Sequence, residues 1–269
     1  MSGRTALAVL GEPLRYTQTP ALHRAGLEAL GIEGDSVALR TAPADLRGRL
    51  ADLAARGYRG VNLTSPLKEV VLEHLDRVSE AARAARSVNT VGFEPDGWWG
   101  DTTDGPGLVD LLGVLGRDVK RERALLLGAG GAARSVALAL AAAGALSVAA
   151  SARNPEAARA AWKEIPGAAL VGWRSREESA HLGEATLVIH ATPLVGEPVS
   201  LERVSSRALI LDLVYGAEPT PWVRAARARG QEAYDGLGLL VFQARRSLAL
   251  WFARAVPVDP LARAVGWPR

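Results

Sequence analysis

A single lysine in the segment GVNLTSPLKEVV, residues 60–71, is the first candidate for chemistry. The chain has 32 lysine and arginine residues, yet the only lysines are Lys68, Lys120 and Lys163. If position 68 needed only a solvated positive charge, the usage of this chain would favour arginine. Arginine stays protonated near neutral pH, whereas a lysine amine can release its proton in a suitable environment. The use of lysine here raises the question whether Lys68 transfers a proton; a helix-start lysine in a salt bridge is the structural alternative.

Amide side chains are also scarce, and two of them lie near Lys68 along the chain. The asparagines are Asn62, Asn89 and Asn154. A buried amide needs hydrogen-bond partners, whereas asparagines in turns serve as caps. Asn62 lies inside a strand-like segment and fits a turn poorly, so we expect it to belong to a polar site.

A glycine-rich turn stands in the segment LLLGAGGAAR, between an apolar strand-like run and a helix-like run. Gly128, Gly130 and Ala133 fit the pattern Gly-x-Gly-x-x-Gly/Ala. Glycines allow a tight turn and let a pyrophosphate approach the N-terminus of the following helix, where free N–H groups attract anions. The pattern alone is weak, but its strand–turn–helix setting predicts a dinucleotide site rather than a plain turn.

The next predicted strand ends in Ser151-Ala152-Arg153-Asn154, without an acidic residue. A domain that prefers NAD usually carries Asp or Glu at this place to bind the ribose hydroxyls. Arg153 can instead pair with a 2′-phosphate, which favours NADP. The alternative is an ordinary exposed arginine in an arginine-rich chain.

Strand-like and helix-like segments alternate along the chain and restart near residue 104. The expected strands are 4–11, 35–41, 60–65, 145–154, 168–173, 186–194 and 207–215; the expected helices are 20–31, 43–57, 66–76, 104–116 and 239–255; 123–144 combines a strand, the glycine turn and a helix. A hairpin is expected over 89–103, turning at Pro95-Asp96-Gly97. This pattern predicts an α/β protein with parallel sheets and two domains.

The composition argues against several classes of site and partner. The chain has no cysteine, and its four histidines lack ligand spacing, so we expect neither disulfides nor a metal. The pI is near 9.6, but the net charge is only +3 and no long basic block occurs, so we expect no nucleic-acid partner. No leader segment or membrane-spanning run stands out, which makes a cytoplasmic protein the expectation.

Several ordered motifs together resemble the shikimate dehydrogenase family over nearly the whole chain. They are GEPLRYTQTPALH (11–23), GVNLTSPLKE (60–69), SVNTV (87–91), GDTTDGPG (100–107), HATPLVG (190–196), LDLVYGAEPTP (211–221) and DGLGLLVFQA (235–244). The resemblance implies a substrate-binding domain over 1–103, to which 238–269 returns, and a Rossmann-type NADP-binding domain over 104–237. It also implies reversible reduction of 3-dehydroshikimate by NADPH, in a monomer or homodimer.

The resemblance further implies roles for individual residues. Lys68 would exchange the proton, and Asp104 beside it would hold its geometry. The implied substrate-binding residues are Thr17, Thr19, Asn62, Thr64, Asn89, Tyr215 and Gln243. The implied cofactor-binding residues are Gly128, Ala129, Gly130, Gly131, Ala132, Ala152, Arg153, Asn154, Thr192, Leu213 and Gly236.

The chain departs from the family pattern at several of these places. Thr17 and Thr19 stand where the family has two serines, and each adds a methyl group to the carboxylate pocket. Some relatives that accept quinate carry threonine at the position of Thr19, so a quinate or dual quinate/shikimate dehydrogenase stays open. The other departures are Tyr16 for histidine, Thr102 and His190 for asparagine, Leu239 for methionine, and Ala152-Arg153-Asn154 for Asn-Arg-Thr.

A further alternative is a non-catalytic regulator or cofactor sensor on the same fold, since fold does not determine function. The retention of both Lys68 and Asp104 argues against it.

Overall fold

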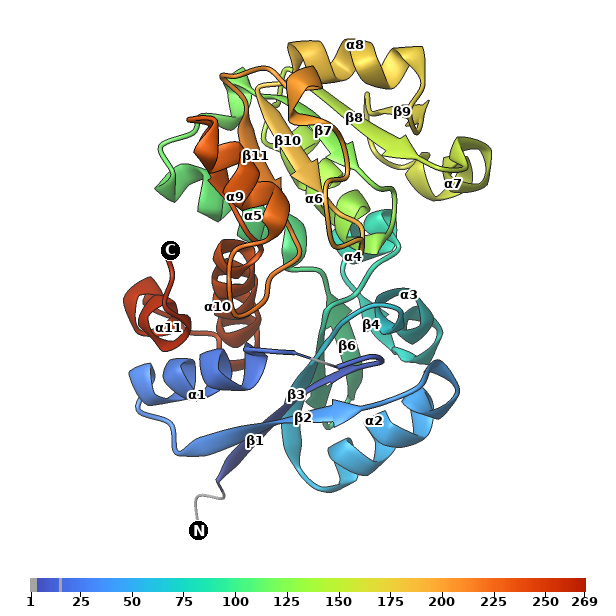
Figure 1. The fold of residues 1–269 in the computed structure, drawn as a ribbon. Helices are drawn as coiled ribbons and strands as arrows, with labels where there is room; N and C mark the ends of the chain where they lie inside the picture. The colour runs from blue at the N-terminus through green and yellow to red at the C-terminus, as the bar shows by residue number, and fades with distance from the viewer. Residues whose placement is uncertain (1–3, 15) are drawn as a thin grey trace.

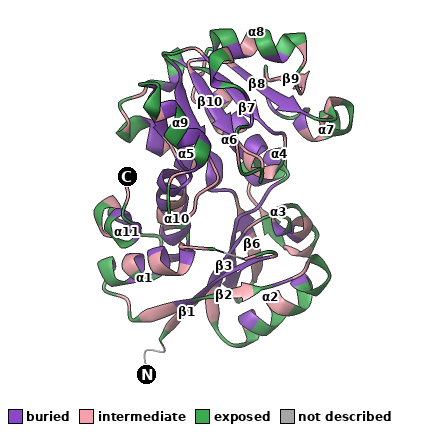
Figure 2. Cartoon of the chain, viewed as in Figure 1, coloured by how far each residue is buried: buried purple, intermediate pink, exposed green. Residues whose placement is uncertain are grey.

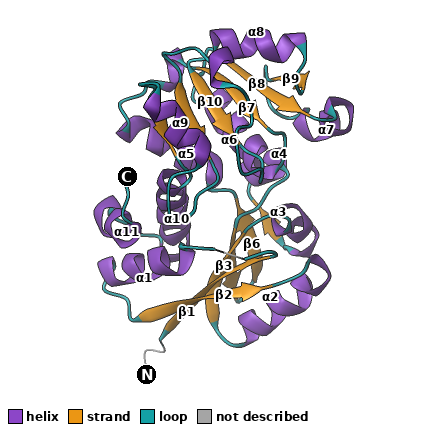
Figure 3. Ribbon diagram, viewed as in Figure 1, coloured by secondary structure: helices purple, strands orange, loops and turns teal. Residues whose placement is uncertain are grey.

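Residues 4–14 and 16–269, the part of the chain that the computed structural model describes, form two six-stranded sheets with helices packed against them (Figures 1 and 3). Residues 1–3 and 15, which fall within the predicted substrate domain, lie outside the described residues. In the described part, no helix combines the length and apolar character needed to cross a membrane.

The first sheet has the strand order β2-β1-β3-β5-β6-β4. Its strands are β1 (Thr5–Gly11), β2 (Gly34–Arg40), β3 (Tyr58–Leu63), β4 (Arg77–Val78), β5 (Thr90–Glu94) and β6 (Gly97–Asp101), and the helices between them are α1 (Thr19–Ala29), α2 (Leu46–Ala55), α3 (Leu67–Val70) and α4 (Glu80–Ala85). β1 is parallel to β2 and β3, whereas β5 is antiparallel to β3 and β6.

The first sheet is mixed, because the predicted hairpin adds the antiparallel strand β5 to the parallel strands β2, β1 and β3. Glu94 pairs with Gly97, so Pro95 and Asp96 form a two-residue turn. Parallel neighbours need a long crossover, whereas a turn of this length can join only antiparallel strands. Gly97 has φ 129°, a conformation that favours glycine.

The second sheet has the order β12-β11-β10-β7-β8-β9, and its strand pairs are parallel, as predicted. This is the order of the doubly wound dinucleotide-binding fold, with β7 and β10 at the switch point. Its strands are β7 (Arg123–Leu127), β8 (Ser147–Ala152), β9 (Ala169–Gly172), β10 (Leu187–His190), β11 (Leu209–Asp212) and β12 (Ala233–Tyr234). The helices of this part are α5 (Asp104–Val114), α6 (Gly131–Ala142), α7 (Pro155–Trp162), α8 (Arg176–Glu184) and α9 (Pro221–Ala228).

The helix expected over 66–76 is much shorter than predicted. α3 ends at Val70, a 3₁₀ turn covers Val71–His74, and β4 follows at Arg77. Successive β-branched valines restrict side-chain freedom in a helix, which fits the early end. The edge strand β4 and the short helix α4, capped by Ser79, had no clear signal in the sequence.

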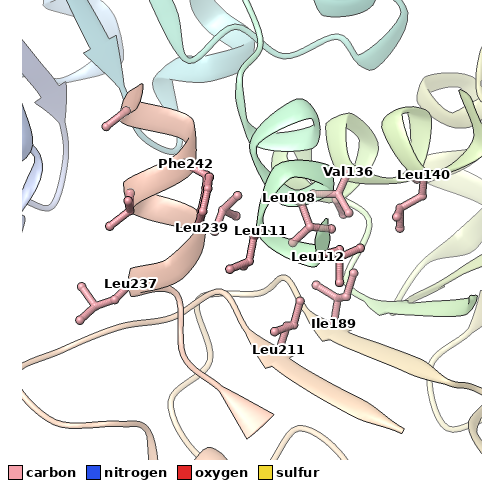
Figure 4. Close-up of a cluster of buried hydrophobic side chains, with 14 of the residues drawn as sticks. Leu108, Leu111, Leu112, Val136, Leu140, Ile189, Leu211, Leu237, Leu239 and Phe242 are labelled. Carbon is pink, nitrogen blue, oxygen red and sulfur yellow. The ribbon is translucent and has the colours of Figure 1, made fainter. Parts of the chain in front are cut away.

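The long C-terminal helix α10 (Leu237–Phe252) connects the two parts of the molecule. It packs against α5 on one side and α1 on the other, and α11 (Val258–Val265) packs on α1 (Figure 1). Apolar side chains of α10 belong to one buried cluster with side chains of α5, α6 and the second sheet (Figures 2 and 4). As predicted, Leu248 and Trp251 are buried while Gln243 faces a cavity.

Candidate active site

A cavity of about 250 Å³ lies between the two parts of the chain. The residues predicted for catalysis and substrate binding all line it: Thr17, Thr19, Asn62, Thr64, Lys68, Asn89, Asp104, Tyr215 and Gln243. They come from the loops that follow β1, β3 and β11, from the loop before β5, and from β3, α1, α3, α5 and α10. The structure thus gathers residues that span 227 positions, Thr17 to Gln243, around one space.

Lys68 and Asp104 form an ion pair in this cavity. Lys68 Nζ lies 2.6 Å from Asp104 Oδ2, and the two side chains are only 13% and 5% exposed. The other carboxylate oxygen accepts a hydrogen bond from Asn89 Nδ2 at 2.9 Å. An ammonium has three donors, and this pairing uses one of them. Lys68 therefore sits in a fixed position with donor capacity left for a ligand.

Asn62 lines the cavity, but its amide is engaged with protein groups. Its Nδ2 donates to Asn89 O at 2.8 Å and to Ser247 Oγ at 3.0 Å. Its Oδ1 lies 2.8 Å from His23 Nε2. Since an amide oxygen only accepts, His23 Nε2 carries the proton and Nδ1 accepts from Ser36 Oγ at 2.8 Å. The amide of Asn89 is engaged just as fully, with Thr103, Asp104 and Gln243. Both asparagines therefore hold the polar network of the cavity together, and their contact with substrate stays a prediction.

The buried His23 makes stability depend on pH. Burial lowers the pKa of His23 from 6.5 to about 4, because the charged ring is desolvated. An unfolded histidine binds a proton below about pH 6.5, whereas the folded one stays neutral to about pH 4. Protons therefore favour the unfolded state, and stability is lost as the pH falls through this window.

We expect the free energy of unfolding to drop by about 2 kcal/mol between pH 7 and pH 5 through His23 alone. Urea unfolding at both pH values measures this difference. The change should be smaller in His23→Gln, which cannot titrate, and should persist in the control His181→Gln. An equal drop in His23→Gln and in the native protein would contradict this assignment.

One buried hydroxyl residue next to the site, Ser247, was missed by the sequence reasoning. Ser247 Oγ lies 2.7 Å from Thr90 Oγ1 and 3.2 Å from Thr103 Oγ1, and Thr103 also donates to Asn89 Oδ1. Ser247 follows Gln243 by four residues on α10, and residues at this spacing share a helix face. That spacing was a usable signal for Ser247.

Two tyrosines from different parts of the chain, Tyr16 and Tyr215, line the cavity. The rings of Tyr16 and Tyr215 lie 5.9 Å apart between centroids. Burial raises the pKa of the Tyr215 phenol, so the hydroxyl stays protonated as a hydrogen-bond donor. Beside them, Thr17 Oγ1 donates to Thr19 Oγ1 at 3.2 Å. The threonine pair therefore presents hydroxyl groups to the same cavity as Lys68.

A second, more open hollow of about 710 Å³ adjoins the first, because Ala132 lines both. The predicted cofactor residues that line it are Gly128, Ala129, Gly130, Gly131, Ala132, Ala152, Arg153, Asn154 and Thr192. Leu213 and Gly236 instead line the first cavity, next to the substrate residues. A Cβ on Gly236 would lie 2.3 Å from Leu213 O, so only glycine fits there.

The glycine turn fits a bound pyrophosphate. α6 begins at Gly131, and among the described residues no side chain caps its N-terminus, which leaves N–H groups free for an anion. Gly128 has φ 121°, and a Cβ there would lie 2.8 Å from the Thr192 methyl group. The backbone can therefore turn tightly at this place only with glycine.

Asn154 and Arg153, which follow β8, differ in their hydrogen-bond and charge partners. Asn154 Oδ1 accepts from Ala157 N at 3.1 Å and so caps α7. Arg153 is exposed and, within the described part of the chain, pairs with no carboxylate. Its guanidinium is therefore available to an anionic ligand.

His190, which stands where the family pattern has asparagine, belongs to a buried hydrogen-bond network next to this hollow. His190 lies 2.8 Å from Asp212 Oδ1 through Nδ1 and 2.6 Å from Thr192 Oγ1 through Nε2. Since a carboxylate only accepts, Nδ1 donates the hydrogen bond to Asp212, and in this tautomer Nε2 accepts from the Thr192 hydroxyl. His190 thereby orients the Thr192 hydroxyl at the edge of the hollow.

Comparison with known proteins agrees with this geometry. Residues 9–91 match the family model described as the shikimate dehydrogenase substrate binding domain. The shikimate dehydrogenase (NADP(+)) of Acidiphilium cryptum is 41% identical, over 98% of this chain and 97% of that protein. The chain belongs to the shikimate dehydrogenase family. This membership confirms the resemblance seen in the sequence and the class of NADP-dependent oxidoreductases acting on a CH–OH group.

Solved structures of this family share the fold. The shikimate 5-dehydrogenase of Thermus thermophilus, solved with NADP(H) and shikimate, is 36% identical, with a TM-score of 0.87 over 97% of this chain and 98% of that one. The 5-ketofructose reductase of a Gluconobacter strain is 25% identical, with a TM-score of 0.83 over 98% of both chains. Shikimate dehydrogenase architecture thus also occurs in a protein named for a different substrate, so the fold does not by itself define the substrate.

Proposed function

We propose that the protein catalyses the reversible NADPH-dependent reduction of 3-dehydroshikimate to shikimate, a step towards chorismate and the aromatic amino acids. The observation that carries this proposal is the Lys68–Asp104 pair in a polar cavity that adjoins the glycine-turn hollow. This arrangement suits a reaction in which a hydride reaches a ketone carbon while a proton reaches its oxygen.

NADPH supplies the hydride when it is bound. The Lys68 ammonium donates a proton to the developing alkoxide, and neutral Lys68 accepts it in the reverse direction. Asp104 keeps Nζ in place through the 2.6 Å contact, and Asn89 in turn holds Asp104. Lys68 is the catalytic acid and base, and Asp104 is its partner.

The remaining lining residues orient the substrate. We assign the carboxylate to the hydroxyls of Thr17 and Thr19, and the ring hydroxyls to Asn62, Thr64, Asn89, Tyr215 and Gln243. Fixed orientation of reacting groups lowers a barrier by up to roughly 7–11 kcal/mol in ideal cases. Within this set, Asn62 is held in place by its hydrogen bonds to Asn89 O and Ser247 Oγ.

The glycine turn would hold the pyrophosphate, and Arg153 the 2′-phosphate. Leu213 and Gly236 line the same cavity as Lys68, which supports the proposal that the nicotinamide end meets Lys68 there. We divide the chain into a substrate domain, 1–103 with 238–269, and a cofactor domain, 104–237. We further propose a cytoplasmic monomer or homodimer without a nucleic-acid partner.

A spectrophotometric assay tests the activity. NADPH absorbance should fall on mixing with 3-dehydroshikimate, and should rise when NADP is mixed with shikimate. Quinate is the second candidate substrate, because Thr17 and Thr19 line the cavity where the family pattern has two serines. Assays of shikimate and quinate, each with NADP and with NAD, show which substrate and which cofactor the protein prefers. If absorbance changes in none of the four combinations, a non-catalytic sensor is favoured.

Thr17→Val and Thr19→Val should each raise the Michaelis constant for shikimate by about ten- to a hundredfold. A hydrogen bond to a charged group contributes about 1.5–3 kcal/mol, and valine keeps the shape without the hydroxyl. Initial rates over a range of shikimate concentrations measure the effect, with Thr5→Val, away from the cavity, as control. Unchanged constants in both variants would place the carboxylate elsewhere.

Arg153→Ala should lower the preference for NADP over NAD by about ten- to a hundredfold, the contribution of one charged contact. The measurement is the ratio of kcat/KM with the two cofactors in the native protein and the variant. Arg159→Ala, an exposed arginine on α7 paired with Glu156, is the matched control. A native preference for NAD, or a ratio that does not move, would refute the phosphate contact.

A further inference from the structure

Beyond Arg153, a second arginine faces the adenosine end of the cofactor hollow. A hollow lined by Arg153, Trp173, Arg174, Thr192, Pro193 and Leu194 continues the glycine-turn hollow, with which it shares four of these residues: Arg153, Trp173, Thr192 and Pro193. β8 and β9 are parallel neighbours, with Ala152 opposite Gly172. Arg153 and Arg174 therefore extend from the carboxyl ends of adjacent strands, the edge where such sheets bind ligands.

The turn that carries Arg174 is held firmly by buried groups. Arg174 has φ 59°, a left-handed conformation that a residue with a side chain keeps only where its surroundings hold it. Its N–H donates to Glu178 Oε2 at 3.1 Å, and Ser151 Oγ on β8 donates to the same oxygen. Trp173 N also donates to Ala152 O at 2.8 Å. The position of Arg174 next to the end of β8 is thus built into the fold.

The charges around this hollow favour an anion with more than one negative charge. No acidic residue occurs among those that line the two hollows. Both arginines are exposed, and within the described ranges their guanidinium groups form no ion pair. Glu178, beneath the turn, is fully buried and lies 3.6 Å from Arg203. A phosphate monoester carries a charge of about −1.5 to −2 at pH 7, more than one arginine balances.

We propose that Arg174 is a second determinant of NADP specificity, which binds the 2′-phosphate together with Arg153. Two guanidinium groups supply charge-assisted hydrogen bonds to different oxygens of one phosphate. The inference rests on the proposed placement of NADP, with its adenosine end at the carboxyl ends of β8 and β9.

Measuring the binding of adenosine 2′,5′-bisphosphate and adenosine 5′-monophosphate by calorimetry tests the role of Arg174 without catalytic turnover. The two ligands differ only in the 2′-phosphate. Arg174→Gln should weaken the bisphosphate about tenfold and leave the monophosphate within about twofold. Arg174→Lys, which keeps the charge, should recover part of the loss. Arg176→Gln removes the same charge two residues away, outside both hollows, and should change neither constant.

The other outcomes separate this inference from the cofactor placement. If Arg153→Gln weakens the bisphosphate while Arg174→Gln behaves like Arg176→Gln, the role of Arg174 is wrong and the placement stands. If neither Arg153→Gln nor Arg174→Gln has an effect, the placement of the 2′-phosphate fails as well. Equal weakening of both ligands by Arg174→Gln would also overturn the inference, because the contact would then not involve the 2′-phosphate.

Discussion

Lys68→Ala is expected to lower kcat by about 10²–10⁴-fold, the usual contribution of a general acid or base. The Michaelis constant should change far less, because the proton donor acts chiefly in the transition state. Steady-state kinetics with shikimate and NADP measures both constants. Lys163→Ala, at an exposed lysine, is the matched control and should keep the native rate.

Lys68→Arg separates proton transfer from charge. Arginine can still form an ion pair with Asp104, so the cavity keeps a positive charge opposite that carboxylate. A guanidinium does not exchange a proton near neutral pH, and turnover should therefore stay within about tenfold of the alanine variant. An active arginine variant would show that position 68 needs only a positive charge, and near-native turnover in Lys68→Ala would remove the proposed role altogether.

Asp104→Asn is expected to damage both stability and turnover. The substitution keeps the shape of the side chain but leaves the largely buried Lys68 ammonium without its counter-charge. Breaking a buried ion pair from one side costs about 3–5 kcal/mol, and the remaining exposure of Lys68 places the loss near the lower value. We also expect kcat to fall at least about tenfold, because Nζ loses its fixed position.

Urea unfolding and kinetics on a double-variant cycle test this expectation. Lys68→Met/Asp104→Asn should be more stable than Asp104→Asn alone, since no unpaired charge remains. Asp52→Asn, which breaks an exposed pair with Arg56, should have little effect. If the double variant lost the sum of the two single losses, Lys68 and Asp104 would not be coupled in the folded protein.

The sequence alone was sufficient for features that depend on local order. The glycine turn between β7 and α6, the hairpin after Asn89 and the apolar strands of the second sheet follow from neighbouring residues, and each was predicted. The scarcity of lysine singled out Lys68, and several motifs in order indicated the family. These signals are readable because turn geometry and strand burial restrict residue types over short distances.

The tertiary structure decided which side chains contact one another and which of their polar groups remain available to a ligand. Lys68 and Asp104 are 36 residues apart in the chain and lie 2.6 Å from each other. Asn62 was predicted as a ligand residue, but His23 and Ser247 engage its amide. No sequence pattern pointed to Arg174, because only the parallel pairing of β8 and β9 brings it beside Arg153. Such contacts depend on long-range packing of whole elements, which no local pattern of residue types encodes.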